Sequence, residues 1–225
     1  MCAFLADLAT VDVSGGDTVL AVPLGSTEQH GAHLPVSTDT DIAVALCSAL
    51  AAERPDVVVA PAVPYGSSGE HAGFAGTLSI GQAATELLVV ELARSATETF
   101  QHVLFVSAHG GNSAPVRRAV ARLQGEGRDV SLFQPAWDGD AHAGHTETSL
   151  QLLLRPDVVR PERAVVGDTR PVADLMPLLQ TGGVRAVTTT GVLGDPTTAS
   201  VKAGRELLAA LVADLTAHVT AWRAS

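Results

Sequence analysis

The sequence predicts an α/β fold in which a mostly parallel β-sheet is flanked by helices on both faces. Short β-branched runs alternate with longer segments of helical period, and each run passes directly into a loop that contains Gly or Pro. Such alternation is typical of parallel strands joined by helical crossovers. Hydrophobic residues make up 46% of the 225 residues, and we identify no repeat or linker, so residues 1–225 are predicted to form one domain.

Four apolar runs are predicted to be strands. Residues 19–24, 57–63 and 102–108 have the length and composition of buried strands, and residues 130–133 are a fourth candidate. In open α/β sheets the functional residues gather in the loops beyond the carboxyl ends of the strands. Chemically capable side chains are therefore expected to follow these strands along the chain.

Four longer segments have the period of helices: residues 41–54, 81–100, 114–125 and 201–222. In the first segment, Ile42, Leu46 and Leu50 fall on one face, as expected of a helix packed on a sheet. The third segment is entered through Asn112 and Ser113, which are candidate caps. The last segment turns its leucines and valines inward, so each of the four helices is predicted to cover the sheet.

The charge balance argues against nucleic acid as a partner. The formal net charge is −10, and the 14 Lys and Arg residues form no cluster along the chain. Phosphate binding depends on clustered basic residues, which this composition lacks. The chain also contains only 4% aromatic residues, so few side chains are available to stack on bases.

Neither a membrane nor an oxidising compartment is indicated. No apolar run approaches the roughly 20 residues needed to span a bilayer. The first residues lack a basic segment and carry Asp7 within their apolar stretch, which is atypical of a secretory signal, so a cytoplasmic location is expected. The two cysteines, Cys2 and Cys47, are too few for a disulfide framework or a thiolate metal site, and Cys47 is predicted to be buried.

The first chemically rich segment, residues 25–35, follows the first predicted strand. Glu28 and His30 are two residues apart, so in an extended segment both side chains point the same way. Asp39 opens the next helix, where its carboxylate is either a ligand or a helix cap. Asp41 is better suited to a charge in the first helical turn.

The second segment, residues 107–113, follows the third predicted strand. Gly110 and Gly111 come directly after His109, which allows a tight turn at the strand end. A phosphate-binding loop is disfavoured, because neither the Walker lysine nor the glycine spacing of dinucleotide-binding loops is present. Asn112 is expected to hold the turn or to cap the following helix.

The third segment, residues 140–149, contains His142 and Glu147. Glu147 begins a short predicted helix and shares a face with Leu150 and Leu154, which favour burial. A buried carboxylate is costly unless it pairs or binds metal. The alternative is a first-turn glutamate that is still in water, and this segment alone leaves both interpretations open.

Together these segments supply carboxylates and histidines beyond predicted strands or at helix starts. This oxygen and nitrogen ligand set suits Zn, Mn or Fe(II), and the lack of cysteine disfavours a purely structural zinc site. We therefore predict bound divalent metal. His102, at a strand start, and His218, in the last helix, are expected to be surface or structural histidines.

These motifs, in this order, resemble those of the creatininase (creatinine amidohydrolase) family over nearly the whole chain. The markers are residues 25–34 with Thr38 and Asp39, Tyr65-Gly66, Glu70-His71, and residues 74–77, 109–112, 142–149 and 191–197. The resemblance implies a parallel-sheet α/β fold, metal-dependent amide hydrolysis and assembly as a homo-oligomer, commonly a hexamer.

The resemblance also implies a two-metal site. Its ligands would be Glu28, Asp39 and His109 for one divalent ion, and His30, Asp39 and Glu147 for the other. Asp39 would bridge the two ions, and His142 matches the residue that transfers a proton. The metal would be zinc, Fe(II) or manganese. His33, Glu70, His71 and His145 would line the pocket or serve structural roles.

One departure bears on the substrate. Creatinine-hydrolysing members place a glutamate where this chain has Gly111, so creatinine is not the expected substrate. Residues 140–149 and 191–199 resemble the mycofactocin-system branch, which implies removal of a C-terminal Val-Tyr-derived dipeptide from a modified precursor peptide. Hydrolysis of a small cyclic amide or a formamide, and a non-catalytic metal-binding scaffold, are the alternatives.

Overall fold

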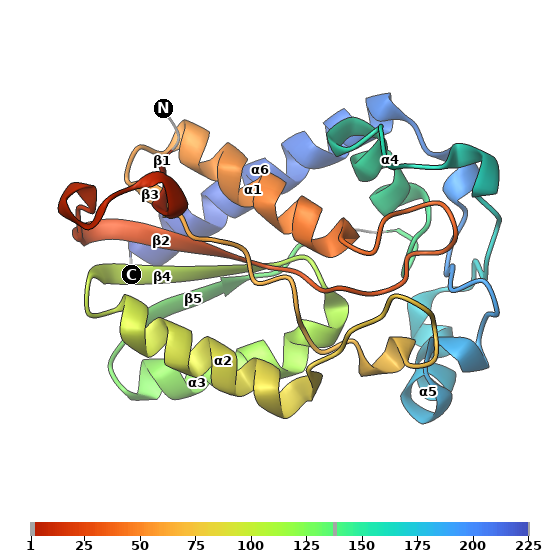
Figure 1. The fold of residues 1–225 in the computed structure, drawn as a ribbon, viewed down its shortest axis with the longest axis horizontal. Helices are drawn as coiled ribbons and strands as arrows, with labels where there is room; N and C mark the ends of the chain where they lie inside the picture. Colours follow the sequence, from red (N-terminus) through yellow and green to blue (C-terminus); the bar gives the residue numbers. More distant parts are fainter. Residues whose placement is uncertain (1–2, 137–138, 225) are drawn as a thin grey trace.

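The computed structural model describes residues 3–136 and 139–224. Within these residues, parallel strands form one sheet in the order β1-β3-β2-β4-β5 (Figure 1). The strands are β1 (Ala3–Phe4), β2 (Gly16–Leu24), β3 (Val57–Val59), β4 (Phe100–Ser107) and β5 (Asp129–Phe133). The predicted parallel sheet is confirmed.

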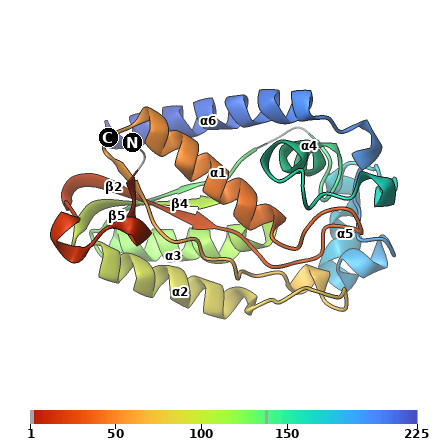
Figure 2. The same cartoon turned by 45° about the horizontal axis from the view of Figure 1, so that its top comes forward.

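Helices cover both faces of the sheet. One face carries α1 (Thr38–Glu53), α4 (His145–Leu154) and α6 (Val201–Arg223), and the other carries α2 (Gly81–Ala96) and α3 (Ser113–Gly125) (Figures 1 and 2). A further helix, α5 (Val172–Gly182), lies beyond the ends of the strands, beside the loops that leave them (Figure 1). None of the described helices is long and apolar enough to cross a membrane.

Alternate residues of β2 pack on opposite faces of the sheet. Val19 and Ala21 join the hydrophobic cluster under α1, α4 and α6, whereas Leu20 and Val22 join the cluster over α2 and α3. Side chains of a strand alternate with period two, and here both faces are buried. This double burial explains why residues 19–24 are almost continuously apolar.

Two predicted boundaries are wrong. The strand expected over residues 57–63 stops at Val59, after which Pro61 interrupts the run, and Val63 makes only an isolated bridge to Leu24. The helix expected over residues 81–100 ends at Ala96, and Phe100 begins β4 instead. A buried helical residue and a buried strand residue are equally apolar, so hydrophobicity alone misplaced this junction.

Two elements were not predicted. Within residues 3–136, β1 pairs with β3 at two positions, too short a run to show any period. α5 carries an apolar stripe of Val172, Leu175, Met176 and Leu179, but it also contains Pro177, which is atypical of a helix interior. Cys47 is buried on α1, as predicted, whereas Cys2 lies outside the described residues.

The register of the sheet brings the chemically rich loops together. Leu24 at the end of β2 pairs with Ser107 at the end of β4, and the Ala108 N–H donates to the carbonyl of Leu24. The chain therefore leaves both strands side by side, at the end of the sheet beside α4 and α5 (Figure 1). This placement at the carboxyl edge agrees with the expectation for the functional residues.

Candidate metal centre

Asp39 lies at the middle of a buried cluster of carboxylates and histidines. Its Oδ1 is 3.3 Å from His30 Nε2, and its Oδ2 is 3.4 Å from His109 Nδ1. The Ser26 hydroxyl donates to Oδ2 at 2.5 Å. Ser37 holds the N-cap position of α1, and the Asp39 carboxylate turns away from the helix backbone toward the two imidazoles. The interpretation of Asp39 as a plain helix cap is therefore wrong.

Glu28 reaches the same cluster from the loop after β2. It is 1% exposed, and its Oε2 lies 3.3 Å from His109 Nε2. Its Oε1 lies 3.2 Å from His71 Nε2 and 3.8 Å from His142 Nδ1. The Oε2 atom accepts no hydrogen bond from any described residue. A buried carboxylate oxygen that lacks a donor has the character expected of a metal ligand.

His109 is held at the end of β4 by the loop that carries Ser67. Its Nε2 lies 2.9 Å from the Ser67 carbonyl. Asn112 fastens this arrangement, because its Oδ1 accepts the Ser67 N–H and its Nδ2 donates to the Gly25 carbonyl, both at 2.9 Å. Asn112 therefore holds the turn, as one expectation had it. Its side chain makes no capping hydrogen bond to α3, and Ser113 is already the first residue of that helix.

Glu147, in the first turn of α4, completes the cluster from the other side. Its side chain is 9% exposed, and its Oε2 lies 3.8 Å from His30 Nε2. The same oxygen accepts the Ala143 N–H at 2.5 Å. The alternative of a first-turn glutamate still in water is wrong, because the leucines on its face draw α4 into the core.

His142 lies beside His30 and His71, on a loop whose backbone pairs with that of Leu193. Its backbone forms an isolated antiparallel bridge with Leu193, through bonds of 3.1 and 2.8 Å. Its ring centroid is 4.3 Å from that of His30 and 4.4 Å from that of His71. His142 therefore joins the predicted ligands in space, although a loop far along the sequence carries it.

The remaining histidines fall into three groups. His71 belongs to the cluster, with Glu70 beside it at 3.6 Å from His109 Nε2. His33 contacts Thr148 at 2.9 Å and His145 contacts Thr198 at 2.8 Å, so the hydrogen bonds of both rings go to residues outside the ligand sets. The expected structural roles of the other two are supported by their hydrogen bonds: His102 contacts Asp129 and Asp17, and His218 contacts Ser131.

Two groups of three ligands match the implied metal sets. In each group the ligand atoms lie within 4.8 Å of one another: Glu28, Asp39 and His109 in one, and His30, Asp39 and Glu147 in the other. Asp39 is common to both. Two further groups share Glu28: one adds His30 and His142, the other Glu70 and His71. This mixture of carboxylate oxygen and imidazole nitrogen fits divalent Zn, Mn or Fe.

Burial makes ionisation of the clustered carboxylates unfavourable, and a bound cation would reduce this cost. Burial raises the pKa of Glu28 to about 7, and the charge of Asp39 adds to this rise. Burial also raises the pKa of Glu147. Burial opposes ionisation of Asp39 too, but His30 and His109 hold its pKa below the usual range. A divalent cation among these groups would favour the ionised form of all three carboxylates.

The pKa values of the clustered histidines shift in opposite directions, according to the charges around each ring. Burial disfavours charge on His30, yet Asp39 and Glu147 outweigh it and raise its pKa to about 10. Burial, aided by the charge on His30, lowers the pKa of His71 to about 3 and that of His142 well below 6.5. His71 and His142 are therefore neutral at pH 7, the form in which imidazole binds metal or accepts a proton.

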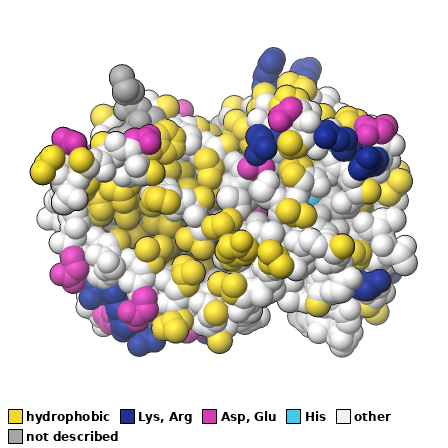
Figure 3. Space-filling view, viewed as in Figure 1, with side chains coloured by type: hydrophobic (Ala, Val, Ile, Leu, Met, Phe, Trp, Pro, Cys, Tyr) yellow, Lys and Arg dark blue, Asp and Glu magenta, His cyan; other side chains and the backbone are white. Residues whose placement is uncertain are grey.

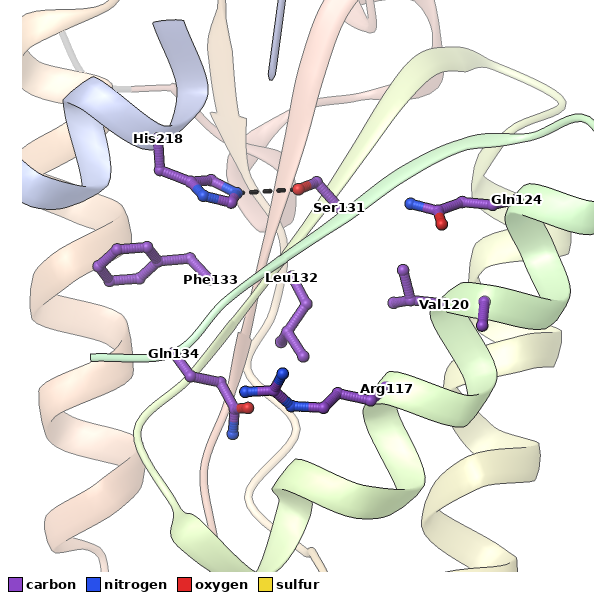
Figure 4. A pocket seen from close by; sticks show the side chains of 9 residues that line it. Arg117, Val120, Gln124, Ser131, Leu132, Phe133, Gln134 and His218 are labelled. Atoms are coloured by element: carbon purple, nitrogen blue, oxygen red, sulfur yellow. Dashed lines mark hydrogen bonds between the residues drawn. The ribbon is translucent and has the colours of Figure 1, made fainter. Parts of the chain in front are cut away.

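The cluster is hidden inside the molecule. Figure 3 shows hardly any histidine on the face that it displays. Of the cluster members, Glu70 is the most open, with a side chain 33% exposed. A hollow of about 460 Å³ lies elsewhere, between α3, β5 and α6 (Figure 4). Its lining includes Arg117 and His218 but none of the predicted metal ligands. This hollow is therefore not the candidate metal centre.

Sequence reasoning missed two polar residues that serve the cluster. Ser26 donates to Asp39, and the Gln29 side-chain nitrogen lies 2.9 Å from His71 Nδ1. In a regular strand Gln29 would point away from Glu28 and His30. The segment is irregular, so its side chains do not alternate. The one available signal was two uncharged polar residues inside a motif whose neighbours are buried.

Comparison with known proteins gives consistent similarities in sequence. The family model described as creatinine amidohydrolase matches residues 6–219. A relative named mycofactocin precursor peptide peptidase, from Mycolicibacterium smegmatis, is 49% identical over 212 residues, which cover 91% of this chain and 85% of the relative.

Solved structures of creatininases resemble the chain over almost its full length. One, described as "Creatininase Mn", has a TM-score of 0.80 and 26% identity, and the match covers 97% of this chain and 98% of the other. A mutant creatininase described as Zn-Zn type also has a TM-score of 0.80 and 26% identity, with 96% of each chain covered. Those proteins therefore hold manganese or zinc in a similar fold.

Proposed function

The chain belongs to the creatininase family, and we propose that it is a two-metal peptidase that acts on the mycofactocin precursor peptide. The name of the relative from Mycolicibacterium smegmatis supports the substrate, since nearly half of the aligned residues are identical. The bond broken would be the one that releases a C-terminal dipeptide derived from Val and Tyr. Metal-dependent hydrolysis of an amide bond is the chemistry that the ligand set supports.

The observation that carries this proposal is the position of Asp39. Its two carboxylate oxygens face different histidines, Oδ1 toward His30 and Oδ2 toward His109. A carboxylate placed in this way joins two ligand groups, with Glu28 and His109 on one side and His30 and Glu147 on the other. These residues would hold two divalent ions, with zinc, Fe(II) and manganese as the candidates.

The metal pair and the protein have separate tasks. When bound, a pair of divalent ions would supply Lewis acidity and lower the pKa of water in the site. His142, which burial keeps neutral, would accept a proton from the attacking water as its oxygen bonds to the amide carbon. The same ring would return that proton to the leaving nitrogen as the C–N bond breaks.

The substrate would approach on the side of Glu70. That carboxylate is the most exposed member of the cluster and lies 3.6 Å from His109 Nε2. Every implied ligand is less than one-tenth exposed, so a peptide meets Glu70 before it meets them. Glu70 would thus contact the substrate at the entrance, whereas the ligands lie deeper.

The role of His142 is tested by His142→Ala with the modified precursor peptide as substrate. The variant is expected to lose turnover by roughly 10²–10⁴-fold, the range for loss of a proton-transferring side chain, while its metal content stays near that of wild type. Mass spectrometry of the released fragment and elemental analysis measure the two quantities. His145→Ala is the matched control, since His145 contacts Thr198 outside the cluster. Loss of metal in His142→Ala would contradict the proposed role.

A further inference from the structure

The side-chain amide of Gln29 has only one orientation that satisfies its neighbours. Its Oε1 accepts the Gly31 N–H at 2.9 Å, and its Nε2 donates to the Gly191 carbonyl at 3.0 Å. If the amide were flipped, a nitrogen would face the Gly31 N–H and an oxygen would face the Gly191 carbonyl. Both contacts would be repulsive, so the assignment of oxygen and nitrogen is fixed by the backbone.

The Gln29 amide nitrogen has more neighbours than protons. It lies 2.9 Å from His71 Nδ1 and 3.1 Å from His142 Nε2, in addition to the Gly191 carbonyl. An amide nitrogen carries only two protons, so one of these three contacts is not a hydrogen bond from Gln29. The protonation of the two imidazoles decides which contact it is.

His142 is the neighbour that receives no proton from the Gln29 side chain. Its Nε2 lies 2.8 Å from the backbone carbonyl of Gln29, which only accepts hydrogen bonds. His142 Nε2 therefore carries a proton and donates it to that carbonyl. The two protons of the Gln29 amide then go to the Gly191 carbonyl and to His71 Nδ1, and each of the four groups is satisfied.

The same arrangement fixes the proton on His71. Because Nδ1 accepts from Gln29, the ring proton lies on Nε2, which faces Glu28 Oε1 at 3.2 Å. His71 then donates to Glu28 and has no lone pair on Nε2 to offer a metal. The group of Glu28, Glu70 and His71 is thereby removed from the sets that could hold an ion.

We propose that Gln29 is a positioning residue that keeps both His71 and His142 in the tautomer protonated on Nε2. In this tautomer His71 orients Glu28 through a hydrogen bond. His142 presents the bare Nδ1 to the cluster, 3.8 Å from Glu28 Oε1, and this is the atom through which it exchanges protons. The last statement rests on the proposed function, whereas the tautomers do not.

The backbone around Gln29 is built to keep the amide in place. Gly191 has φ +81°, and a Cβ at this position would lie 1.9 Å from Gln29 Oε1. A side chain at residue 191 is therefore excluded by both the backbone conformation and the amide. The Gln29 N–H is anchored to Thr77 Oγ1 at 3.1 Å. These contacts restrain the side chain before any substrate arrives.

The tautomers are measured by long-range ¹H–¹⁵N correlation spectra of the full-length protein labelled with ¹⁵N-histidine. Spectra are recorded both metal-free and loaded with zinc, which is diamagnetic. The ring signals of His71 and His142 are expected to show a protonated Nε2 and an unprotonated Nδ1 in both forms. A proton on Nδ1 of either ring in the wild-type protein overturns the proposal, and this result requires no variant.

The Gln29→Ala variant tests whether Gln29 sets the tautomers of His71 and His142. The ring signals of His71 and His142 are expected to shift or broaden, while those of His145 and His218 stay in place. Gln151→Ala is the matched control, because Gln151 is equally buried but bonds to Thr38 and Asp41. Unchanged signals of both rings in Gln29→Ala, or equal changes in Gln151→Ala, would overturn the role of Gln29.

Turnover supplies a second readout. For Gln29→Ala, kcat on the precursor peptide is expected to fall on the order of 10–100-fold, with a smaller change in KM. Gln29→Glu keeps an oxygen for the Gly31 N–H but loses both amide protons, so it should show the same fall. Wild-type kcat in both variants would contradict the link to catalysis. If wild type cleaves no peptide, the proposed function fails, and the tautomer measurement still stands by itself.

Discussion

Glu70 occupies the space that a side chain on Gly111 would fill. A Cβ on Gly111 would lie 2.2 Å from Glu70 Oε1, and also 2.1 Å from the Ser67 carbonyl oxygen and 2.5 Å from His109 Nε2. Gly183 makes similar room on the other side, where a Cβ would lie 2.6 Å from the Glu70 carbonyl oxygen. Two glycines thus allow Glu70 to stand beside the metal ligands.

Gly111→Ala is predicted to displace Glu70 and to impair the site. The added methyl cannot fit without moving Glu70, Ser67 or His109, and overpacking of this kind costs about 1–3 kcal/mol. We expect a higher KM for the precursor peptide and a lower free energy of unfolding in urea. Gly110→Ala is the matched control, since a Cβ there meets nothing within 4 Å. Equal behaviour of the two variants would remove the proposed steric role of Gly111.

Glu147→Gln is predicted to empty one half of the metal centre. The amide oxygen can still accept the Ala143 N–H, so the loop is expected to hold, but the negative charge that faces His30 is lost. We expect the metal content to fall from about two ions per chain to about one. Elemental analysis measures this content, and Glu206→Gln on the exposed face of α6 controls for the substitution itself. Full metal content in Glu147→Gln would show that Glu147 is not a ligand.

The pH dependence of stability is predicted to report on His218. Burial lowers its pKa below 6.5, and its Nε2 faces the Ser131 hydroxyl at 2.8 Å in the hollow of Figure 4. As the pH falls, His218 therefore takes up its proton at a higher pH in the unfolded chain than in the folded chain. Its contribution to stability is complete above about pH 6.5 and is lost as the pH falls toward the lowered value.

The test compares wild type with His218→Gln in urea unfolding at a series of pH values. The glutamine oxygen can accept from Ser131 but does not titrate in this range. The stability advantage of wild type over the variant is expected to shrink as the pH falls from 8 to 5. An advantage that stays constant or grows over this range would show that the pKa of His218 is not lowered by folding.

The sequence predicted the sheet and the ligand cluster because both leave strong local signals. Residues 19–24 are apolar throughout, and Glu28 and His30 follow them in an unusual polar motif. The rule that functional loops meet at the carboxyl edge of the sheet placed the loops after β2 and β4 together. The assignment of Asp39 and Glu147 as ligands came from the family resemblance, because the sequence around each residue left a second interpretation open.

Other features depend on tertiary contacts that leave no local pattern. α5 was missed because Pro177 stands inside an apolar run of helical spacing, and β1 because its two described residues show no period. The task of Gln29 depends on Gly191 and His142, which lie far along the chain. The place of Glu70 beside His109 likewise depends on a missing side chain at Gly111. Such relationships appear only once the loops are placed side by side.

The most direct test of the account is the metal content of wild type and Asp39→Asn, purified without oxygen and without chelator. An amide at residue 39 cannot bridge two cations as a carboxylate does, so wild type should carry about two ions per chain and the variant almost none. Asp41→Asn is the control, because Asp41 lies on the same helix as Asp39 but bonds to Ser37 and to Arg155 at the end of α4. Wild type that binds no divalent metal after reconstitution, or an Asp39→Asn variant that keeps both ions, would contradict the account.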